Sequence, residues 1–310
     1  MRALLAAIIL CSALPSVAQI KPSAKAPPGT QVITSFDPNH AVVGWLEIFP
    51  FESKILHNTR MIRVLLPANY LSPHNAARTY PVLYMQDGQN LFDEATAAHG
   101  EWQMDDTIEH LVGGFKIPPM LVVGIDNAGE KRASEYLPFP DLQNMEDNPA
   151  GSEKSVEGKE YARFLLTEVV PFVEKHYRVS RGALNTGLGG SSYGADAALY
   201  TALAYPDIFG HLLLESPVLT IGGDQLIKDT EKAKLLPQKI YIGVGTSESL
   251  KGDPKQAAEM VEKVQDLQKI LRKKGMTTSR LQVVIENGGE HNEAAWSRRL
   301  PDALVFLYGK

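Results

Sequence analysis

Cysteine is nearly absent from this sequence. The chain has 310 residues and a single cysteine, Cys11. It lies inside an N-terminal apolar run that we expect to be cleaved off, and the residue before it, Leu10, is larger than the small residue that a lipoprotein signal places there. The mature chain then has no thiol, which excludes disulfides, cysteine–zinc sites and a cysteine nucleophile.

Long apolar runs are absent beyond the first residues. A short positive start, Met1-Arg2, precedes the apolar run Ala3 to Leu14, and Pro15-Ser16-Val17-Ala18 follows it. This order predicts a signal peptide over residues 1–18, with cleavage after Ala18. The alternative is a membrane anchor, but the run is too short for the roughly 30 Å of a hydrocarbon core. We expect an exported protein, periplasmic or secreted, with no membrane span.

Positive charge is not concentrated anywhere in the chain. The net charge is −5, and short basic runs such as Arg272-Lys273-Lys274 are typical of a solvated helix end, so we expect no nucleic-acid partner. Proline and glycine are scattered without a period, which excludes solenoid and collagen-like folds. We also expect no cofactor and no metal, and the sequence leaves the oligomeric state open.

The sequence does contain an alternation of apolar runs with helical patterns. Residues 19–31, rich in Pro, Ala and Lys, predict a flexible leader, and a single folded domain is expected over 32–310. Apolar or alternating runs predict strands at 44–53, 59–66, 80–86, 120–125, 183–188, 211–214, 239–244 and 280–285. Helical spacing predicts helices at 105–112, 161–176, 195–204, 254–274 and 293–307. The fold class is therefore α/β, with antiparallel N-terminal strands, a mostly parallel central sheet and helices on both faces.

A serine motif lies at the end of one predicted strand, where folds of this class bind ligands. Gly190-Ser191-Ser192-Tyr193-Gly194 fits G-x-S-x-G and stands between an apolar strand and an alanine-rich helix. In such a nucleophile elbow the serine occupies a strained turn, and the helix N-terminus favours developing negative charge. Ser192 is the expected nucleophile. Ser191, the other hydroxyl, is at a variable position, and the alternative is an ordinary Gly/Ser turn.

His291 has the position expected of the base. It follows the last predicted strand, within Glu286-Asn287-Gly288-Gly289-Glu290-His291-Asn292, and precedes the last helix. An imidazole there can take the serine proton near neutral pH and return it to the leaving group. A lone histidine is more often structural, and we interpret the other seven in that way: His40, His57, His74, His99, His110, His176 and His211.

The acid of a triad should follow a strand between Ser192 and His291. Tyr241 to Glu248 ends a strand in a turn and presents Glu248, which would accept the second N–H of the imidazole and stabilise the imidazolium. Asp253 is the second candidate. A site that works as a Ser–His pair is the remaining alternative.

Acyl transfer also needs N–H donors for the oxyanion. The amide of Tyr193, the residue after the nucleophile, is one expected donor. The other is expected in Gln86-Asp87-Gly88-Gln89-Asn90, which follows the third predicted strand, and we assign it to the Gln89 amide, with Gly88 helping the backbone to turn. Asp87-Gly88 would form a tight turn in either case.

Taken together, these segments resemble the putative-esterase family of α/β hydrolases, which includes esterase D, feruloyl and acetylxylan esterases, ferric-siderophore esterases and mycolyltransferases. The resemblance runs from about Thr34 to Lys310. It is carried by RVLLPANY at 63–70, YPVLYMQDGQNLFD at 80–93, Arg132 with EYLP at 135–138, GSSYG at 190–194, YPDIFG at 205–210, VGTSE at 244–248 and GGEHNEAAW at 288–296. It implies the α/β-hydrolase fold, one catalytic domain, and nucleophile, acid and base roles for Ser192, Glu248 and His291.

Two departures from the family pattern flank the glycine of the elbow. Tyr193 stands where the family often has Met, which narrows the expected pocket, and Ala195 stands where it often has Gly. Aromatic rings can stack on a sugar or an aryl acid, and an arginine can meet an anionic group. Substrate contacts are accordingly expected from Trp102, Arg132, Glu135, Tyr136 and Trp296. The alternative is that Arg132 and Glu135 form an ion pair that supports the long polar segment 126–158, and that Trp296 belongs to the core.

The expected function is hydrolysis of a carboxylic ester through an acyl-enzyme. An acetyl or feruloyl ester of carbohydrate is the first expectation for the substrate, because the chain should be exported and the family it resembles includes such enzymes. A ferric-siderophore ester is the second. An acyltransferase with the same machinery and a non-catalytic ligand-binding module remain alternatives, while a serine peptidase is disfavoured because no propeller or large extra domain is evident.

Overall fold

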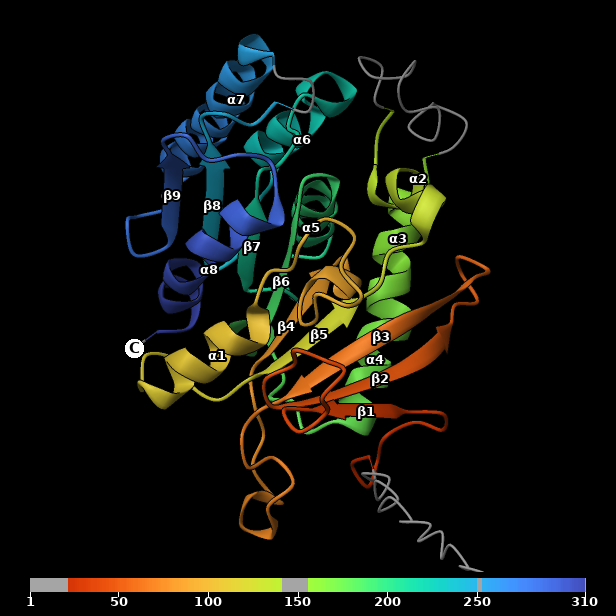
Figure 1. The fold of residues 1–310 in the computed structure, drawn as a ribbon. Helices are drawn as coiled ribbons and strands as arrows, with labels where there is room; N and C mark the ends of the chain where they lie inside the picture. Colours follow the sequence, from red (N-terminus) through yellow and green to blue (C-terminus); the bar gives the residue numbers. More distant parts are fainter. Residues whose placement is uncertain (1–21, 141–155, 250–252, 310) are drawn as a thin grey trace, which may run out of the picture.

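One nine-stranded sheet runs through the computed structural model, which describes residues 22–140, 156–249 and 253–309 (Figure 1). The expected signal peptide over 1–18, with Cys11, lies outside the described residues. The strands lie side by side in the order β1-β2-β3-β5-β4-β6-β7-β8-β9. Their bounds are Gln31–Thr34 (β1), Trp45–Glu52 (β2), Thr59–Leu66 (β3), Val82–Gln86 (β4), Leu121–Ile125 (β5), Thr186–Ser191 (β6), His211–Glu215 (β7), Lys239–Gly245 (β8) and Leu281–Glu286 (β9).

The direction of the strands confirms the predicted α/β-hydrolase fold. Pairing is antiparallel from β1 through β2 and β3 to β5, and parallel from β5 through β4, β6, β7 and β8 to β9. Strand β4 lies between β5 and β6, so the chain reverses its course across the sheet there. Met85 of β4 pairs with Gly189 of β6, which brings the carboxyl ends of these two strands together. Open α/β sheets bind their ligands at such a switch point.

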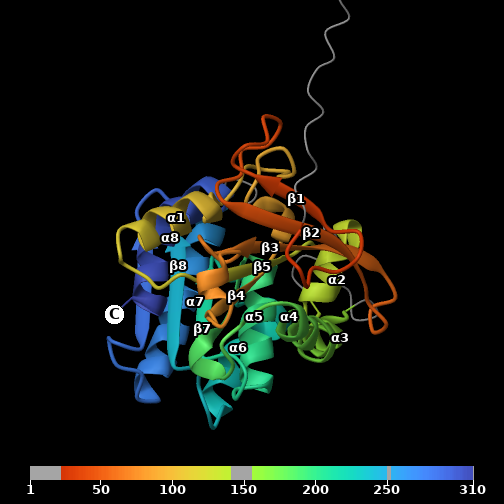
Figure 2. The same ribbon diagram turned by 90° about the horizontal axis from the view of Figure 1, so that it is seen from below.

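Helices cover both faces of the sheet. Helices α1 and α8 pack on one face, and α2 to α7 pack on the other (Figures 1 and 2). Their bounds are Met104–Gly113 (α1), Arg132–Tyr136 (α2), Gly158–Phe164 (α3), Val170–His176 (α4), Tyr193–Ala204 (α5), Ile221–Lys232 (α6), Pro254–Lys273 (α7) and Glu293–Tyr308 (α8). No helix in the described part of the chain is long and apolar enough to cross a membrane.

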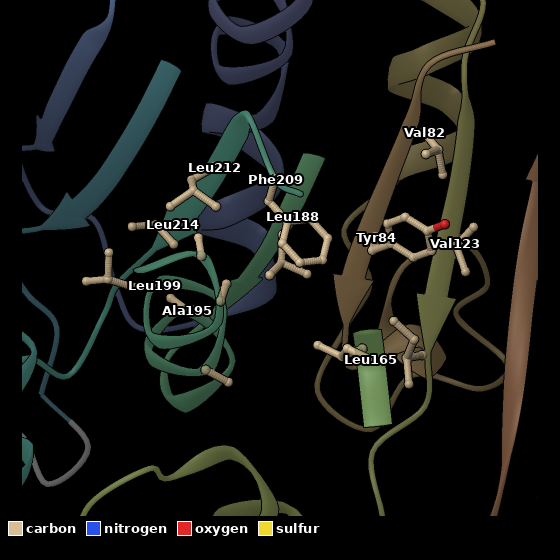
Figure 3. Close-up of a cluster of buried hydrophobic side chains, with 14 of the residues drawn as sticks. Val82, Tyr84, Val123, Leu165, Leu188, Ala195, Leu199, Phe209, Leu212 and Leu214 are labelled. Carbon is tan, nitrogen blue, oxygen red and sulfur yellow. The ribbon is translucent and has the colours of Figure 1, made fainter. Parts of the chain in front are cut away.

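Each central strand contributes side chains to two apolar cores. Val82 and Tyr84 of β4 belong to the core beneath α3 to α7, whereas Leu83 and Met85 belong to the core beneath α1 and α8. This follows from the two-residue period of a strand. Figure 3 shows the first core, with Tyr84 beside Val123 of β5. Strands buried on both faces need apolar residues at nearly every position, which is why the sequence displays them as continuous apolar runs.

Two predicted elements differ from the structure in detail. The strand expected at 183–188 begins at Thr186 and runs to Ser191, after a short 3₁₀ turn at Ala183–Asn185. The helix expected at 161–176 begins at Gly158 and contains a π-helical turn at Leu165–Val169. Pro171 follows that turn, and because proline has no N–H to donate, a regular hydrogen-bond ladder cannot continue through it.

Three elements have no counterpart in the sequence prediction: β1, α2 and α6. Gly222 and Gly223 have positive φ angles of 60° and 66° near the start of α6, and they interrupt the helical backbone of α6 there.

The folded part of the chain also begins before Val32. The backbone N–H and the hydroxyl of Ser23 both donate to the buried carboxylate of Glu47, at 2.5 and 3.0 Å, and so residues from the expected leader pack on β2.

Candidate active site

Four neighbouring parallel strands are each followed by a residue with a hydroxyl, carboxyl or imidazole side chain. Ser192 follows β6, Ser216 follows β7, Glu248 follows the turn after β8, and His291 follows the loop after β9. These strands are adjacent in the sheet. Because their carboxyl ends lie at one edge, residues separated by up to a hundred positions in the sequence come together there.

Ser192 occupies a strained turn between β6 and α5. Its backbone φ and ψ are 55° and −132°, a conformation that L residues rarely adopt. The glycines on either side permit the sharp turn, because a Cβ on Gly190 would lie 2.8 Å from the carbonyl carbon of Gly194. Ser191 is buried within β6. The turn thus distinguishes Ser192 from the rival hydroxyl, and it has the geometry of a nucleophile elbow.

The loop that carries His291 packs closely on strand β8. A Cβ on Gly245 would lie 2.1 Å from the carbonyl oxygen of Gly289, so only glycine allows this approach. Gly288 has a φ of 73°, which glycine adopts without strain and which lets the chain fold back. His291 is held between this loop and α8, with its ring 5.4 Å from the ring of Trp296 in an edge-to-face arrangement.

Glu248, and not Asp253, faces this histidine. Nδ1 of His291 lies 3.3 Å from Oε2 of Glu248, and the glutamate side chain is fully buried. Asp253 is exposed and caps helix α7, where its Oδ1 accepts the backbone N–H of Lys255 at 2.9 Å. The geometry therefore offers one carboxylate to the imidazole.

Hydrogen bonds and a buried arginine surround the Glu248 carboxylate. Its Oε1 accepts the hydroxyl of Ser216 at 2.5 Å and the backbone N–H of Gly245 at 2.6 Å. Nη2 of Arg299 lies 3.7 Å from the same oxygen. Such donors offset the cost of burying a charged carboxylate.

Arg299 serves two further carboxylates. Its Nε and Nη2 donate to Oε2 of Glu215 at 2.9 and 2.7 Å, and its Nη1 donates to Glu286 at 2.6 Å. Complete burial raises the pKa of Glu215 to about 7, although Arg299 acts in the opposite direction. One buried cation is therefore shared among three acidic side chains directly below the site.

The loop after β4 is fixed by an ion pair. Arg132 donates through Nε and Nη2 to the two carboxylate oxygens of Asp87, at 2.7 and 2.9 Å, and Asn127 donates to the same carboxylate at 2.7 Å. Nη2 of Arg132 also reaches the carbonyl oxygen of Ser191 at 3.4 Å. The arginine thus connects the β4 loop with the strand that leads into the elbow.

The tight turn predicted at Asp87-Gly88 is present, and the aspartate is its strained residue. The residue with positive φ is Asp87, at 56°, and not Gly88. Glycine is required at position 88 for another reason, because a Cβ there would lie 2.6 Å from the backbone of Gly124 on β5. Gln89 lies within the 3₁₀ turn Gly88–Asn90, and Tyr193 is the first residue of α5.

Most of the residues expected to contact the substrate are buried in the protein interior. Trp102, Glu135 and Tyr136 are at most 2% exposed, which does not fit direct contact with a substrate. The alternative Arg132–Glu135 ion pair is wrong, because Arg132 pairs with Asp87 while Glu135 pairs with Arg60 at 2.7 Å. The hydroxyl of Tyr136 accepts the backbone N–H of Asp87 at 3.1 Å.

Trp296 belongs to the core, as the alternative reading of the sequence has it. It is 5% exposed, its ring lies 5.7 Å from that of Trp102, and its Nε1 donates to Ser216 at 2.8 Å. Arg132 keeps 28% of its side chain exposed and is the one expected contact with appreciable accessible surface.

Two residues of the site, Ser216 and Arg299, were not predicted from the sequence, and neither was the ion pair by which Asp87 anchors the β4 loop. A signal for Arg299 does exist, because it lies three residues after Trp296 and therefore on the same face of α8. A charged residue on an apolar helix face indicates a buried partner. Among the described residues, no group of three or more His, Cys, Asp or Glu side chains could hold a metal ion.

Sequence comparisons relate the chain to known proteins. Residues 53–307 match the family described as "Putative esterase". The chain is 25% identical over 262 residues to the uncharacterized protein YbbA of Bacillus subtilis, covering 81% of this chain and 93% of that protein. It is 24% identical over 220 residues to an endo-1,4-beta-xylanase/feruloyl esterase of Xylanibacter ruminicola, covering 70% of this chain and 26% of that longer protein.

Solved structures share the fold at low sequence identity. A ferulic acid esterase superposes with a TM-score of 0.61 at 17% identity, covering 85% of this chain and 97% of its own. The BES protein from Bacillus cereus gives 0.65 at 18% identity, covering 92% and 99%. The enterobactin esterase FES from Shigella flexneri gives 0.62 at 19% identity, covering 84% of this chain and 58% of its own.

Proposed function

Since the chain belongs to the putative esterase family and is a carboxylic ester hydrolase, we propose that Ser192, His291 and Glu248 perform its reaction. The observation that carries this proposal is the contact between Nδ1 of His291 and the buried carboxylate of Glu248, at 3.3 Å. A carboxylate at Nδ1 favours the tautomer that has its proton there, which leaves Nε2 as the basic atom.

In the proposed mechanism the Ser192 hydroxyl attacks the ester carbonyl carbon while Nε2 of His291 takes its proton. The new Oγ–C bond gives a tetrahedral intermediate, whose oxyanion accepts hydrogen bonds from the backbone N–H groups of Tyr193 and Gln89. The intermediate collapses, the C–O bond to the alcohol breaks, and His291 returns the proton to the departing oxygen. Water then repeats the same steps on the acyl-enzyme, and the acid is released.

The structure around the two amides supports their proposed role. Both stand at the beginning of helical turns at the carboxyl ends of β4 and β6, which are neighbours in the sheet. The Asp87–Arg132 ion pair holds the β4 loop, and Arg132 also contacts the carbonyl of Ser191. Donors fixed before the reaction stabilise a developing charge without the cost of reorganisation.

For the substrate we propose acetyl or feruloyl esters of carbohydrate. Two of the similar proteins are a xylanase/feruloyl esterase and a ferulic acid esterase. A siderophore ester is the second candidate, supported by the likeness to enterobactin esterases. The apolar N-terminal run with a small-x-small ending at Ala18 supports export as part of this proposal.

The test is the hydrolysis of p-nitrophenyl acetate, followed by a screen of acetyl, feruloyl and siderophore esters. The wild-type protein should give a burst of nitrophenol and continue to turn over, because acylation precedes hydrolysis. Ser192→Ala should have neither phase. Wild-type turnover in that variant would contradict the mechanism.

Product analysis distinguishes hydrolysis from acyl transfer. The wild-type protein is incubated with a feruloyl ester in the presence and absence of a polyol acceptor. Free acid as the main product in both cases supports a hydrolase. Transfer of the acyl group to the polyol would instead support an acyltransferase that uses the same site.

A further inference from the structure

We propose that Ser216 is a positioning residue that holds the Glu248 carboxylate in the orientation facing His291. The inference rests on the proposed function, since it assigns a role relative to the Ser192–His291–Glu248 triad. Ser216 itself does not touch the reacting atoms in this proposal. It acts through the orientation of Glu248.

The backbone of Ser216 is held in an unusual conformation. Its φ is 49° and the residue is fully buried, whereas a residue other than glycine rarely adopts a positive φ. The backbone N–H donates to the carbonyl of Gly243 on β8 at 2.8 Å, so the strand end continues to pair with β8 through the turn. Strained backbone that a surrounding structure keeps in place is concentrated at functional sites.

The hydroxyl of Ser216 has one partner on each side. It accepts the indole N–H of Trp296 at 2.8 Å and donates to Oε1 of Glu248 at 2.5 Å. Because the indole can only donate, its hydrogen bond directs the serine proton toward the carboxylate. Oε1 is thereby occupied, and Oε2 is the oxygen that faces His291.

The same strand end also contacts the nucleophile turn. The backbone N–H of Ser192 donates to the carbonyl of Glu215, the residue before Ser216, at 2.9 Å. Residues 215 and 216 therefore connect the backbone of the nucleophile with the side chain of the acid. A shift of this short segment would move both groups relative to each other, and catalysis is sensitive to displacements of this kind.

The experiment measures kcat and KM for p-nitrophenyl acetate in Ser216→Ala. The loss of a hydrogen bond to a charged group should lower kcat roughly ten- to hundredfold and leave KM nearly unchanged. In the Glu248→Gln background, the same serine substitution should lower kcat by less than about threefold, because residues that act as a unit are not additive. Trp296→Phe, which keeps an aromatic ring but removes the indole N–H, should give a smaller loss with the same dependence on Glu248.

Ser53→Ala is the matched control. Ser53 is 2% exposed and donates to Oε2 of Glu168 at 2.6 Å, so it makes the same kind of bond at the β2–β3 hairpin, three strands away from β6. Its substitution should leave kcat unchanged. Circular dichroism and thermal unfolding check that each variant is folded, and if Ser216→Ala does not fold, Trp296→Phe provides the test.

Wild-type kcat in a folded Ser216→Ala variant, or an equally large loss in the Glu248→Gln background, would overturn the inference. If either outcome is found while Ser192→Ala is inactive, the proposed triad is still supported and only the role assigned to Ser216 is refuted. If Ser192→Ala keeps its turnover, the proposed function itself has failed.

Discussion

Replacing Glu248 with glutamine tests the electrostatic role of the proposed acid. The two side chains have nearly the same shape, and an amide oxygen can still accept from Ser216 and Gly245. What the variant lacks is the negative charge 3.3 Å from Nδ1 of His291. The imidazolium that forms during each proton transfer then has no counter-ion, and Nδ1 loses the acceptor that fixes its tautomer.

The size of the effect follows from that distance. At 3.3 Å, and with an effective dielectric constant of about 20, the attraction between the two charges is about 5 kcal/mol. Each 1.4 kcal/mol changes a rate about tenfold, so kcat should fall roughly 10³- to 10⁴-fold. KM should change little, because the imidazolium exists only after the reaction has begun.

The assay is steady-state hydrolysis of p-nitrophenyl acetate by Glu248→Gln and by Asp253→Asn. Asp253 is exposed and caps α7, and asparagine is an equally good N-cap, so the second variant should retain both wild-type turnover and wild-type stability. The reasoning is refuted if Glu248→Gln retains turnover within about tenfold of the wild type, or if Asp253→Asn shows the larger loss.

Three further predictions concern backbone strain, close packing and pH. Ser192→Gly should abolish turnover yet raise the free energy of unfolding by about 1 kcal/mol or more, because glycine tolerates the φ of 55°; a lower urea midpoint than the wild type would contradict this. Gly88→Ala should lower both kcat and stability, the latter by about 1–3 kcal/mol, since its Cβ would lie 2.6 Å from the backbone of β5; wild-type kcat and urea midpoint would show that the loop has room. Burial lowers the pKa of His211 from 6.5 to about 4, so the unfolded chain binds the proton more tightly and about 3 kcal/mol of stability should be lost as the pH falls from 6.5 to 4. His211→Phe should show a smaller loss in urea titrations over that range, and an unchanged loss would mean that other groups cause it.

Much of the fold could be predicted from the sequence, because central parallel strands are apolar at nearly every position. β4 and β5 stand out for this reason, and their ends are marked by Asp87-Gly88 and by the polar residues after Ile125. Chain order then placed His291 after the last strand. The elements β1, α2 and α6 lack such a pattern, and their formation depends on contacts with the rest of the domain.

The partners of charged residues could not be predicted in the same way. Glu135 pairs with Arg60, 75 positions earlier, because β3 lies beside β5 in the sheet, and the strand order is not evident in the local sequence. For Arg132 and Glu135 the sequence suggests an ion pair between the two as the alternative to substrate contact. The actual partner of Arg132, Asp87, comes from the neighbouring strand end, where tertiary structure and not spacing determines the contact.

The central claim is that the hydroxyl of Ser192 is a nucleophile activated by His291. The most direct measurement is labelling of the folded protein with a fluorophosphonate probe, followed by mass spectrometry of the labelled peptide. We predict one adduct, on Ser192, that forms rapidly in the wild type and far more slowly in His291→Ala. An adduct on Ser191, or equal labelling rates in the two proteins, would contradict the claim.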